Sequence, residues 1–118
     1  MEHEVFDGVV EDDTLLIQKT LRSGQSIKHS GSVVVLGDIN PGAEIIAGGH
    51  VLVAGTVRGV IHAGASGNQK ATITAFHINP IQISIGGVLF QGPDENRIDS
   101  GPLETARIHQ GRIIIDKV

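Results

Sequence analysis

The apolar residues of this chain are gathered into six short segments bounded by glycine, asparagine or proline. The segments are rich in valine, isoleucine and threonine and cover residues 15–20, 32–39, 50–57, 71–78, 82–90 and 106–116. Short runs of this composition between turn residues predict β-strands. Nowhere does an apolar i, i+3, i+4, i+7 spacing persist over three helical turns, so no long helix is expected. The pattern predicts an all-β fold.

Two of the segments repeat one another. Residues 31–39 (GSVVVLGDI) align with residues 49–57 (GHVLVAGTV) at an offset of 18. If one residue is skipped, Gly42 then meets Gly59, and the Ala-Gly pair at 47–48 roughly meets that at 63–64. A period near 18 is typical of one coil of a β-solenoid, in which three short faces meet at tight corners. A glycine-rich β-sandwich is the alternative that this pattern leaves open.

The composition favours a narrow interior. The chain has 16 glycines among 118 residues, nearly twice the average usage of about 7%, and glycine reaches the positive φ angles that tight corners require. Only 3% of the residues are aromatic. Small apolar side chains can stack from coil to coil inside a slender prism, and those predicted to do so are Val35, Val53, Ala54 and Ile73.

Length and charge exclude several classes of protein. At 118 residues the chain is about one domain, and we expect a flexible segment over residues 1–13 followed by the domain over 14–118. The formal net charge of −4 and the absence of Trp and Tyr disfavour binding to nucleic acid or to an anionic membrane. The acidic first residues lack a signal-peptide pattern, and no apolar run approaches the roughly 20 residues of a membrane span. A soluble protein is expected.

No enzymatic motif stands out. The chain has no cysteine, which excludes disulfides, thiolate nucleophiles and cysteine-ligated zinc. A catalytic zinc needs three protein ligands, whereas His50 and His62 are 12 residues apart, out of phase with the repeat, and no close histidine pair occurs. No phosphate-binding loop is present. We therefore predict no metal, no cofactor and no catalytic residue. The irregular loop over 91–102 is predicted to cover an open end of the solenoid.

The segment RSGQ, residues 22–25, carries the most specific binding chemistry. Arg22 offers a planar fork of five donors, Ser23 and Gln25 add neutral donors and acceptors, and Gly24 lets another main chain approach closely. Taken alone, the segment is better explained as a turn that leads the chain into its first coil, with Arg22 as a solvated side chain.

The order of short motifs along the chain adds to this. They are RSGQ at 22–25, GDIN at 37–40, PGAE at 41–44, AGG at 47–49, VRG at 57–59 and HAGA at 62–65, followed by Gly67, Ala71, Ile73, QISI at 82–85 and the closing segment 102–116. From about Thr14 to the end, the chain resembles the C-terminal domain of the MinC family of septum-site-determining proteins. Ser84 departs from the arginine usual in that family.

The resemblance implies a fold and a function. The fold is a short right-handed β-helix of triangular section that forms a homodimer through a flat face. The function is to bind the ATP-bound MinD ATPase, through which alone the protein reaches the membrane, and to help prevent assembly of FtsZ rings at wrong sites. The family's RSGQ motif, the determinant for MinD, maps onto Arg22, Ser23, Gly24 and Gln25, and the same surface is implied for Gly42 and Gly49, and less directly for Glu44 and Arg58.

One difference from the family concerns FtsZ. Full-length members carry an additional N-terminal domain that is the main inhibitor of FtsZ assembly, and only 13 residues precede the matching region here. Contact with FtsZ is therefore expected either directly or through that further domain. Two alternative functions are a zinc-dependent β-helix enzyme of the carbonic anhydrase type and a polymer-forming β-solenoid scaffold.

Overall fold

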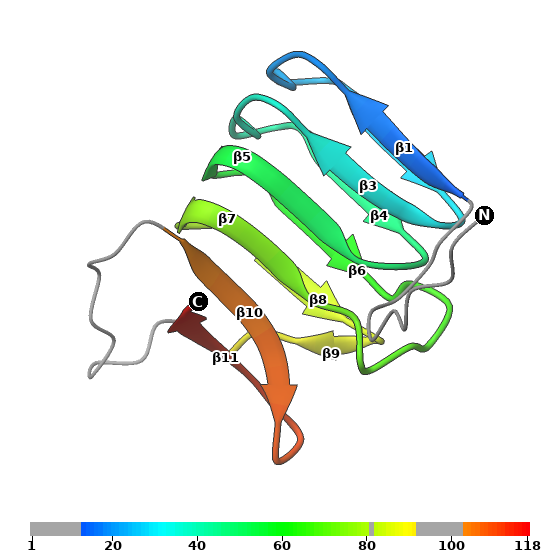
Figure 1. Cartoon of the computed structure of the whole chain (residues 1–118), viewed down its shortest axis with the longest axis vertical. Coiled ribbons are helices and arrows are strands. Elements are labelled where there is room, and N and C mark those ends of the chain that lie inside the picture. Colours follow the sequence, from blue (N-terminus) through cyan, green and yellow to red (C-terminus); the bar gives the residue numbers. More distant parts are fainter. Residues whose placement is uncertain (1–12, 81, 92–102) are drawn as a thin grey trace, which may run out of the picture.

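The chain winds into a right-handed β-solenoid whose coils stack along one axis (Figure 1). The structure, a computed structural model, describes residues 13–80, 82–91 and 103–118, and these contain strands and turns but no helix. One parallel sheet, called sheet A here, is formed in order by β1 (Thr14–Ile17), β3 (Ser32–Val35), β5 (Val51–Val57) and β7 (Ile73–Ile78), and it continues antiparallel into β10 (Glu104–His109) and β11 (Arg112–Lys117). Sheet B is formed by β2 (Ser26–His29), β4 (Glu44–Ala47), β6 (Val60–Ala63), β8 (Gln82–Ile85) and the antiparallel β9 (Val88–Leu89).

A third, shorter side closes the prism. Leu21 pairs with Ile39, and Ile39 with Val57, as isolated parallel bridges between the two sheets. The triangular β-helix predicted from the sequence is thereby confirmed. Among the described residues no helix is long and apolar enough to cross a membrane.

The register of the coils confirms the 18-residue repeat and corrects its continuation. Val33 pairs with Val51 in sheet A, as the alignment required. In sheet B, however, Glu44 pairs with Val60, sixteen residues further on. The skip is therefore two residues, not one, because the corner before β6 is shorter than the corner before β4. The next step is longer: Ile61 pairs with Ile83, because the exposed residues 65–70 form a loop between β6 and β7.

The core consists of aliphatic side chains stacked in columns along the axis. One column is Ile45, Ile61 and Ile83, which are neighbours in sheet B and fully buried. Val35, Val53 and Ile73 are also buried, as predicted. Ala54 was predicted to lie inside but is partly exposed, because it follows the buried Val53 in a strand whose side chains alternate between the two faces.

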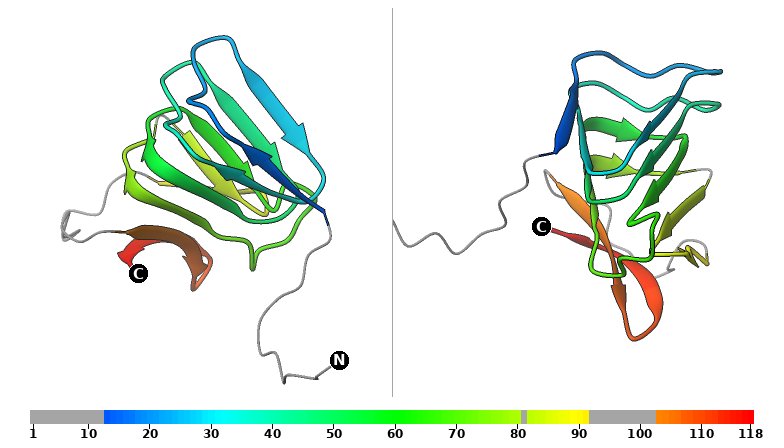
Figure 2. Two further views of the ribbon diagram at one scale, coloured as in Figure 1. Left: turned by 45° about the horizontal axis from the view of Figure 1, so that its top comes forward. Right: turned by 90° about the vertical axis from the view of Figure 1, so that its right-hand side faces the viewer.

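The six apolar segments did not reveal every strand. Most of sheet B was missed, namely β2, β4 and β6, since these are four-residue strands whose outward positions are often polar. Residues 82–90 and 106–116 were each predicted as one strand but contain two, joined by turns at Gly86–Gly87 and Gln110–Gly111 with positive φ. β10 and β11 lie beyond the last parallel coil (Figure 2). The loop over 91–102, predicted to cover an open end of the solenoid, lies almost wholly outside the described residues.

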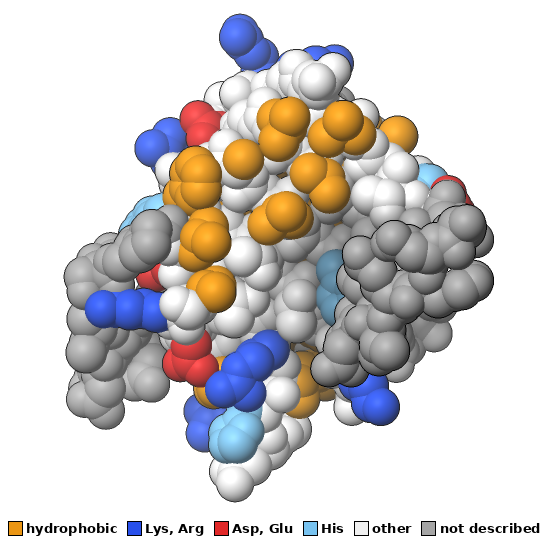
Figure 3. All heavy atoms as spheres, in the orientation of Figure 1, with side chains coloured by type: hydrophobic (Ala, Val, Ile, Leu, Met, Phe, Trp, Pro, Cys, Tyr) orange, Lys and Arg blue, Asp and Glu red, His pale blue; other side chains and the backbone are white. Residues whose placement is uncertain are grey.

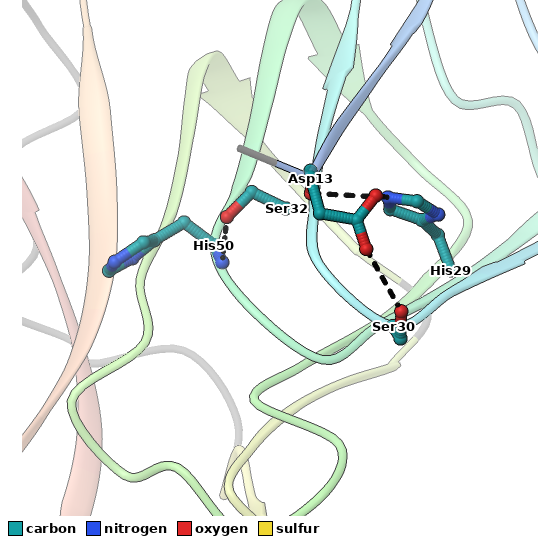
Figure 4. Close-up of polar contacts among 5 residues, drawn as sticks. All are labelled: Asp13, His29, Ser30, Ser32 and His50. Atoms are coloured by element: carbon teal, nitrogen blue, oxygen red, sulfur yellow. Dashed lines mark hydrogen bonds and ion pairs between the residues drawn. The ribbon is translucent and has the colours of Figure 1, made fainter. Parts of the chain in front are cut away.

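The first coil is anchored from its first described residue. The backbone carbonyl of Asp13 accepts a hydrogen bond from the Ser32 N–H at 3.2 Å. Its carboxylate accepts the Ser30 hydroxyl at 3.2 Å and lies 3.2 Å from His29 Nε2 (Figure 4). The rest of the predicted N-terminal segment, residues 1–12, lies outside the described residues.

Sheet A has an apolar outer face. Hydrophobic side chains gather over its parallel strands (Figure 3), where register places Leu16, Val34 and Leu52 side by side. Four large side chains of this face remain markedly exposed, at 53% for Leu16, 47% for Leu36, 42% for Leu52 and 53% for Phe76. Exposed apolar surfaces of this kind are common at sites of protein association.

The stacked core predicts a strong dependence of stability on inward positions. Replacing Ile61 by Ala leaves a cavity between Ile45 and Ile83 and is expected to lower the free energy of unfolding by about 2–5 kcal/mol. Urea denaturation followed by circular dichroism measures this. The matched control is Val60→Ala, whose partly exposed side chain precedes Ile61 in the same strand and is expected to cost less than about 1 kcal/mol. Equal losses for both variants contradict the assigned strand orientation.

Candidate functional site: the Arg22 corner

The corner between the third side and sheet B is built by residues 22–25, called the Arg22 corner here. The Gln25 N–H donates to the Arg22 carbonyl at 3.0 Å, and Gly24 has a φ of 88°. A bond from the fourth to the first residue with positive φ at the third is the pattern of a type II turn, which favours glycine at the third position. The Gln25 side chain tightens the turn, since its Oε1 accepts the Arg22 N–H at 2.8 Å.

A second turn of the same kind lies directly beneath, one coil further on. In residues 40–43 (NPGA), the Ala43 N–H donates to the Asn40 carbonyl at 3.0 Å and Gly42 has a φ of 88°. Proline and glycine there are the preferred central residues of a type II turn. The Gly24 N–H donates to the Gly42 carbonyl at 3.0 Å, and the Glu44 N–H to the Gln25 carbonyl at 3.0 Å. The lower turn therefore fixes the height and tilt of the upper one.

Close approach between the turns depends on Gly42. A Cβ at this position would come within 2.9 Å of Ser23 Cβ and 3.0 Å of Ser23 Cα, and closer still to the hydroxyl. Ser23 therefore rests on the bare backbone of Gly42. In the next coil the corner is too short for a third such turn, and Gly59 passes below the carbonyls of Asn40 and Ala43.

The side chains of the Arg22 corner face solvent. All four residues of the segment 22–25 are exposed, and so is Gly42. Among the described residues Arg22 forms no ion pair, so its guanidinium donors are available to another molecule. An arginine on a backbone held by two turns has much of its position fixed before any partner arrives.

The other predicted residues lie at different distances from this corner. Arg58 is exposed, and its N–H donates to the Ile39 carbonyl at 2.7 Å, two coils below Arg22 on the same side of the prism. Glu44 begins β4 beside Ser26, whose hydroxyl donates to Glu44 Oε1 at 3.5 Å. The structure thus brings Arg22, Glu44 and Arg58 to one corner. Gly49 lies at the opposite end of β4, at the corner that leads into β5, and is not part of this surface.

Sequence reasoning did not assign Ser26 or His62 to this surface. His62 was weighed as a zinc ligand and rejected in favour of a surface histidine, and its Nε2 lies 3.4 Å from Glu44 Oε2. The correct register between β4 and β6 was the missing signal, since the sixteen-residue step sets Glu44 diagonally opposite His62.

His29, His50 and His62 each have a protein partner among the described residues. In the part of the chain that the structure describes, no three His, Asp or Glu side chains are close enough to hold a metal ion. His29 contacts Asp13 and His62 contacts Glu44, while the backbone N–H of His50 donates to Ser32 Oγ at 2.9 Å (Figure 4). A hollow in the surface lies at the end of sheet B away from the Arg22 corner, lined by Lys28, His29, Ser30, Ile46, Gly48, Ala65 and Ser66.

The two stacked glycines predict different costs for the same substitution. Gly24 and Gly42 have the same φ of 88°, so alanine at either position is expected to cost about 1–2 kcal/mol in backbone strain. A Cβ at Gly24 meets nothing within 4 Å, whereas one at Gly42 meets Ser23. Gly42→Ala is therefore expected to destabilise by at least about 1 kcal/mol more than Gly24→Ala, as measured by urea denaturation. Equal costs would show that Ser23 does not rest on Gly42.

Comparison with known proteins gives a consistent result. Residues 15–118 match the family model described as "Septum formation inhibitor MinC, C-terminal domain". A probable septum site-determining protein MinC from Heliobacterium modesticaldum is 47% identical over 107 residues, which is 91% of this chain and 37% of the relative. The protein of the same name from Clostridium novyi is 45% identical over 115 residues, 98% of this chain and 54% of the relative. The chain thus spans about half the length, or less, of these curated relatives.

A solved structure agrees with the fold. A chain of the "MinC:MinD cell division protein complex" from Aquifex aeolicus superposes with a TM-score of 0.80 at 37% sequence identity, over 89% of this chain and 86% of that one. With a family model that covers nearly the whole chain, relatives above 40% identity and this shared β-solenoid, the chain belongs to the MinC C-terminal domain family of septum formation inhibitors.

Proposed function

We propose that this chain is a non-enzymatic adaptor that binds the ATP-bound MinD ATPase through the Arg22 corner and takes part in placing the division septum. The observation that carries this is the exposed Arg22 on a backbone preset by two stacked turns. The relative in the Aquifex aeolicus structure is part of a MinC:MinD complex, which supports the same partner for this chain.

The chemistry of the corner suits a protein surface. A guanidinium can bind a carboxylate or two backbone carbonyls through parallel hydrogen bonds. The amide nitrogen of Gln25 adds donors, since the bond to the Arg22 N–H engages only its oxygen. Because the backbone of the turn is already ordered by these hydrogen bonds, little backbone conformational entropy is lost when a partner binds. Glu44 and Arg58 flank the corner with charges of both signs, which favours a partner surface of mixed charge.

The outer face of sheet A is the surface that we assign to the homodimer. It is apolar and exposed, and residues contributed by different coils lie side by side across it. A two-fold axis normal to such a face would bury Leu16, Leu36, Leu52 and Phe76 against their counterparts. Because the Arg22 corner is on another side of the prism, it stays accessible in this dimer, which would present two copies of it.

The cellular role follows from the partner. MinD supplies the attachment to the inner face of the membrane, and this chain, otherwise cytoplasmic, is recruited there with it. Inhibition of FtsZ assembly then acts where MinD is bound, either by this domain or by the N-terminal domain of full-length family members. End-to-end growth into a scaffold is opposed by β10, which pairs antiparallel with β7 and so ends the parallel stacking of coils.

Removal of the Arg22 side chain tests the binding surface. Arg22→Ala is expected to weaken ATP-dependent binding to MinD at least about tenfold, equivalent to about 1.4 kcal/mol, as measured by co-sedimentation with MinD on vesicles with ATP. Arg112→Ala, an exposed arginine at the start of β11, is the matched control and is expected to bind as wild type does. Undiminished binding by folded Arg22→Ala overturns the assignment of the corner, and no binding by wild type overturns the function.

The dimer face has its own test. Leu52→Asp places a charge in the middle of the apolar face and is expected to convert the dimer to a monomer in analytical ultracentrifugation, because an unpaired carboxylate cannot be buried without a large desolvation cost. Leu89→Asp makes the same change at a leucine of similar exposure in sheet B and is expected to leave the dimer intact. A dimer that persists in Leu52→Asp, or dissociates only in Leu89→Asp, contradicts this face.

A further inference from the structure

A line of polar contacts crosses the outer surface of sheet B, beginning beside the Arg22 corner. The Ser26 hydroxyl donates to Glu44 Oε1 at 3.5 Å, Glu44 Oε2 lies 3.4 Å from His62 Nε2, and His62 Nδ1 lies 2.6 Å from Ser84 Oγ. Each residue comes from a different coil, on β2, β4, β6 and β8 in turn. Glu44, at the edge of the proposed binding surface, is thus held from the side by His62.

The partners of His62 allow it to change charge without moving. In the neutral ring, a proton on Nε2 faces the Glu44 carboxylate, and Nδ1 accepts the Ser84 hydroxyl. In the protonated ring, Nδ1 donates instead, and the same hydroxyl rotates to accept. Because a hydroxyl can serve in either role, both contacts persist in both states. Only the electrostatic attraction on Glu44 changes.

The electrostatic surroundings of His62 on this face are simple. The neighbouring outward side chains are Ser26 and Lys28 from β2, Glu44 and Ile46 from β4, Val60 on β6, Gln82 and Ser84 from β8, and Leu89 from β9. Two of these are ionisable, Glu44 and Lys28. Lys28 stands two strands away with Ile46 between, on the order of 10 Å, so Glu44 is the charge that His62 senses most strongly.

We propose that His62 is a positioning residue for Glu44, and that its protonation lowers the affinity of the Arg22 corner for a partner that donates to this carboxylate. The proposal rests on the proposed function and adds regulation to it. Histidine is the side chain that changes charge between about pH 5 and 8. An imidazolium beside Glu44 competes with a lysine, arginine or backbone N–H of the partner, whereas a neutral imidazole competes weakly.

The sign and size of the effect follow from this competition. At higher pH the carboxylate is held in place but not neutralised, and the partner binds best. At lower pH the Glu44–His62 pair becomes a full ion pair and binding weakens. Both side chains are partly exposed, at 27% for His62 and 40% for Glu44. A partly exposed pair contributes little energy, and a weakening of about two- to fivefold is therefore expected between about pH 8 and pH 6.

The experiment compares the pH profiles of binding for wild type and His62→Gln with the same MinD, ATP and vesicles. At each pH, the dissociation constant of wild type is divided by that of His62→Gln, so that any titration of MinD itself cancels. This ratio is expected to be near one at about pH 8 and to rise two- to fivefold by about pH 6 as wild type weakens. His109→Gln, at the exposed end of β10, is the matched control and should follow wild type at every pH.

Glu44→Gln separates the proposed route from a general effect of charge. With the carboxylate gone, protonation of His62 has nothing to neutralise, so His62→Gln in that background should leave the pH profile unchanged. A ratio that stays constant with pH, or moves the other way, overturns the proposal, provided that urea midpoints show both proteins folded. If wild type fails to bind MinD even at about pH 8, the proposed function itself has failed, and that outcome is distinct.

Discussion

The hydrogen bonds between successive coils are the interaction on which this molecule depends. They join each strand to the strand one coil away in parallel register, and they force every inward side chain to stand on the equivalent side chain below it. A prism of three short faces leaves no space for bulky groups at its centre, so valine, isoleucine, leucine and alanine fill it in columns. The same parallel pairing is thus repeated in each coil, and the antiparallel hairpin of β10 and β11 ends the series.

The same pairing shapes the candidate binding surface. The hydrogen-bond ladders fix the strands, but the corners between them can differ in turn type. Here the equivalent corners of two successive coils both form a type II turn. Stacking identical turns makes the outer turn rigid without burying it. Residues that are distant in sequence, such as Arg22, Glu44 and Arg58, then meet because register brings them to one corner. Side chains that can contact another molecule lie on the corners and outer faces, because the interior is filled by the stacked aliphatic side chains.

Part of this arrangement could be predicted from the sequence. Valine-rich strands between glycines predicted sheet A and the 18-residue repeat, because fully buried positions leave a strong hydrophobic signal. Sheet B was largely missed, since outward residues such as Glu44 and His62 interrupt the apolar pattern of its four-residue strands. Register was the other obstacle. The single-residue skip placed Gly59 opposite Gly42, and the sixteen-residue step seen in the structure is what joins Glu44 to His62.

The loop over residues 65–70 shows that the length of a connection between coils does not affect how the coils stack. Coils are joined by steps of different size, yet Ile61 still stacks on Ile83 and the columns of the core continue past the longer connection. Loop length carries a small entropic cost that grows slowly, and residues 65–70 are exposed. A β-solenoid can therefore gain or lose residues at a corner while the strands on either side keep their register. In such proteins, residues that bind a further partner can be inserted at this loop without disturbing the core.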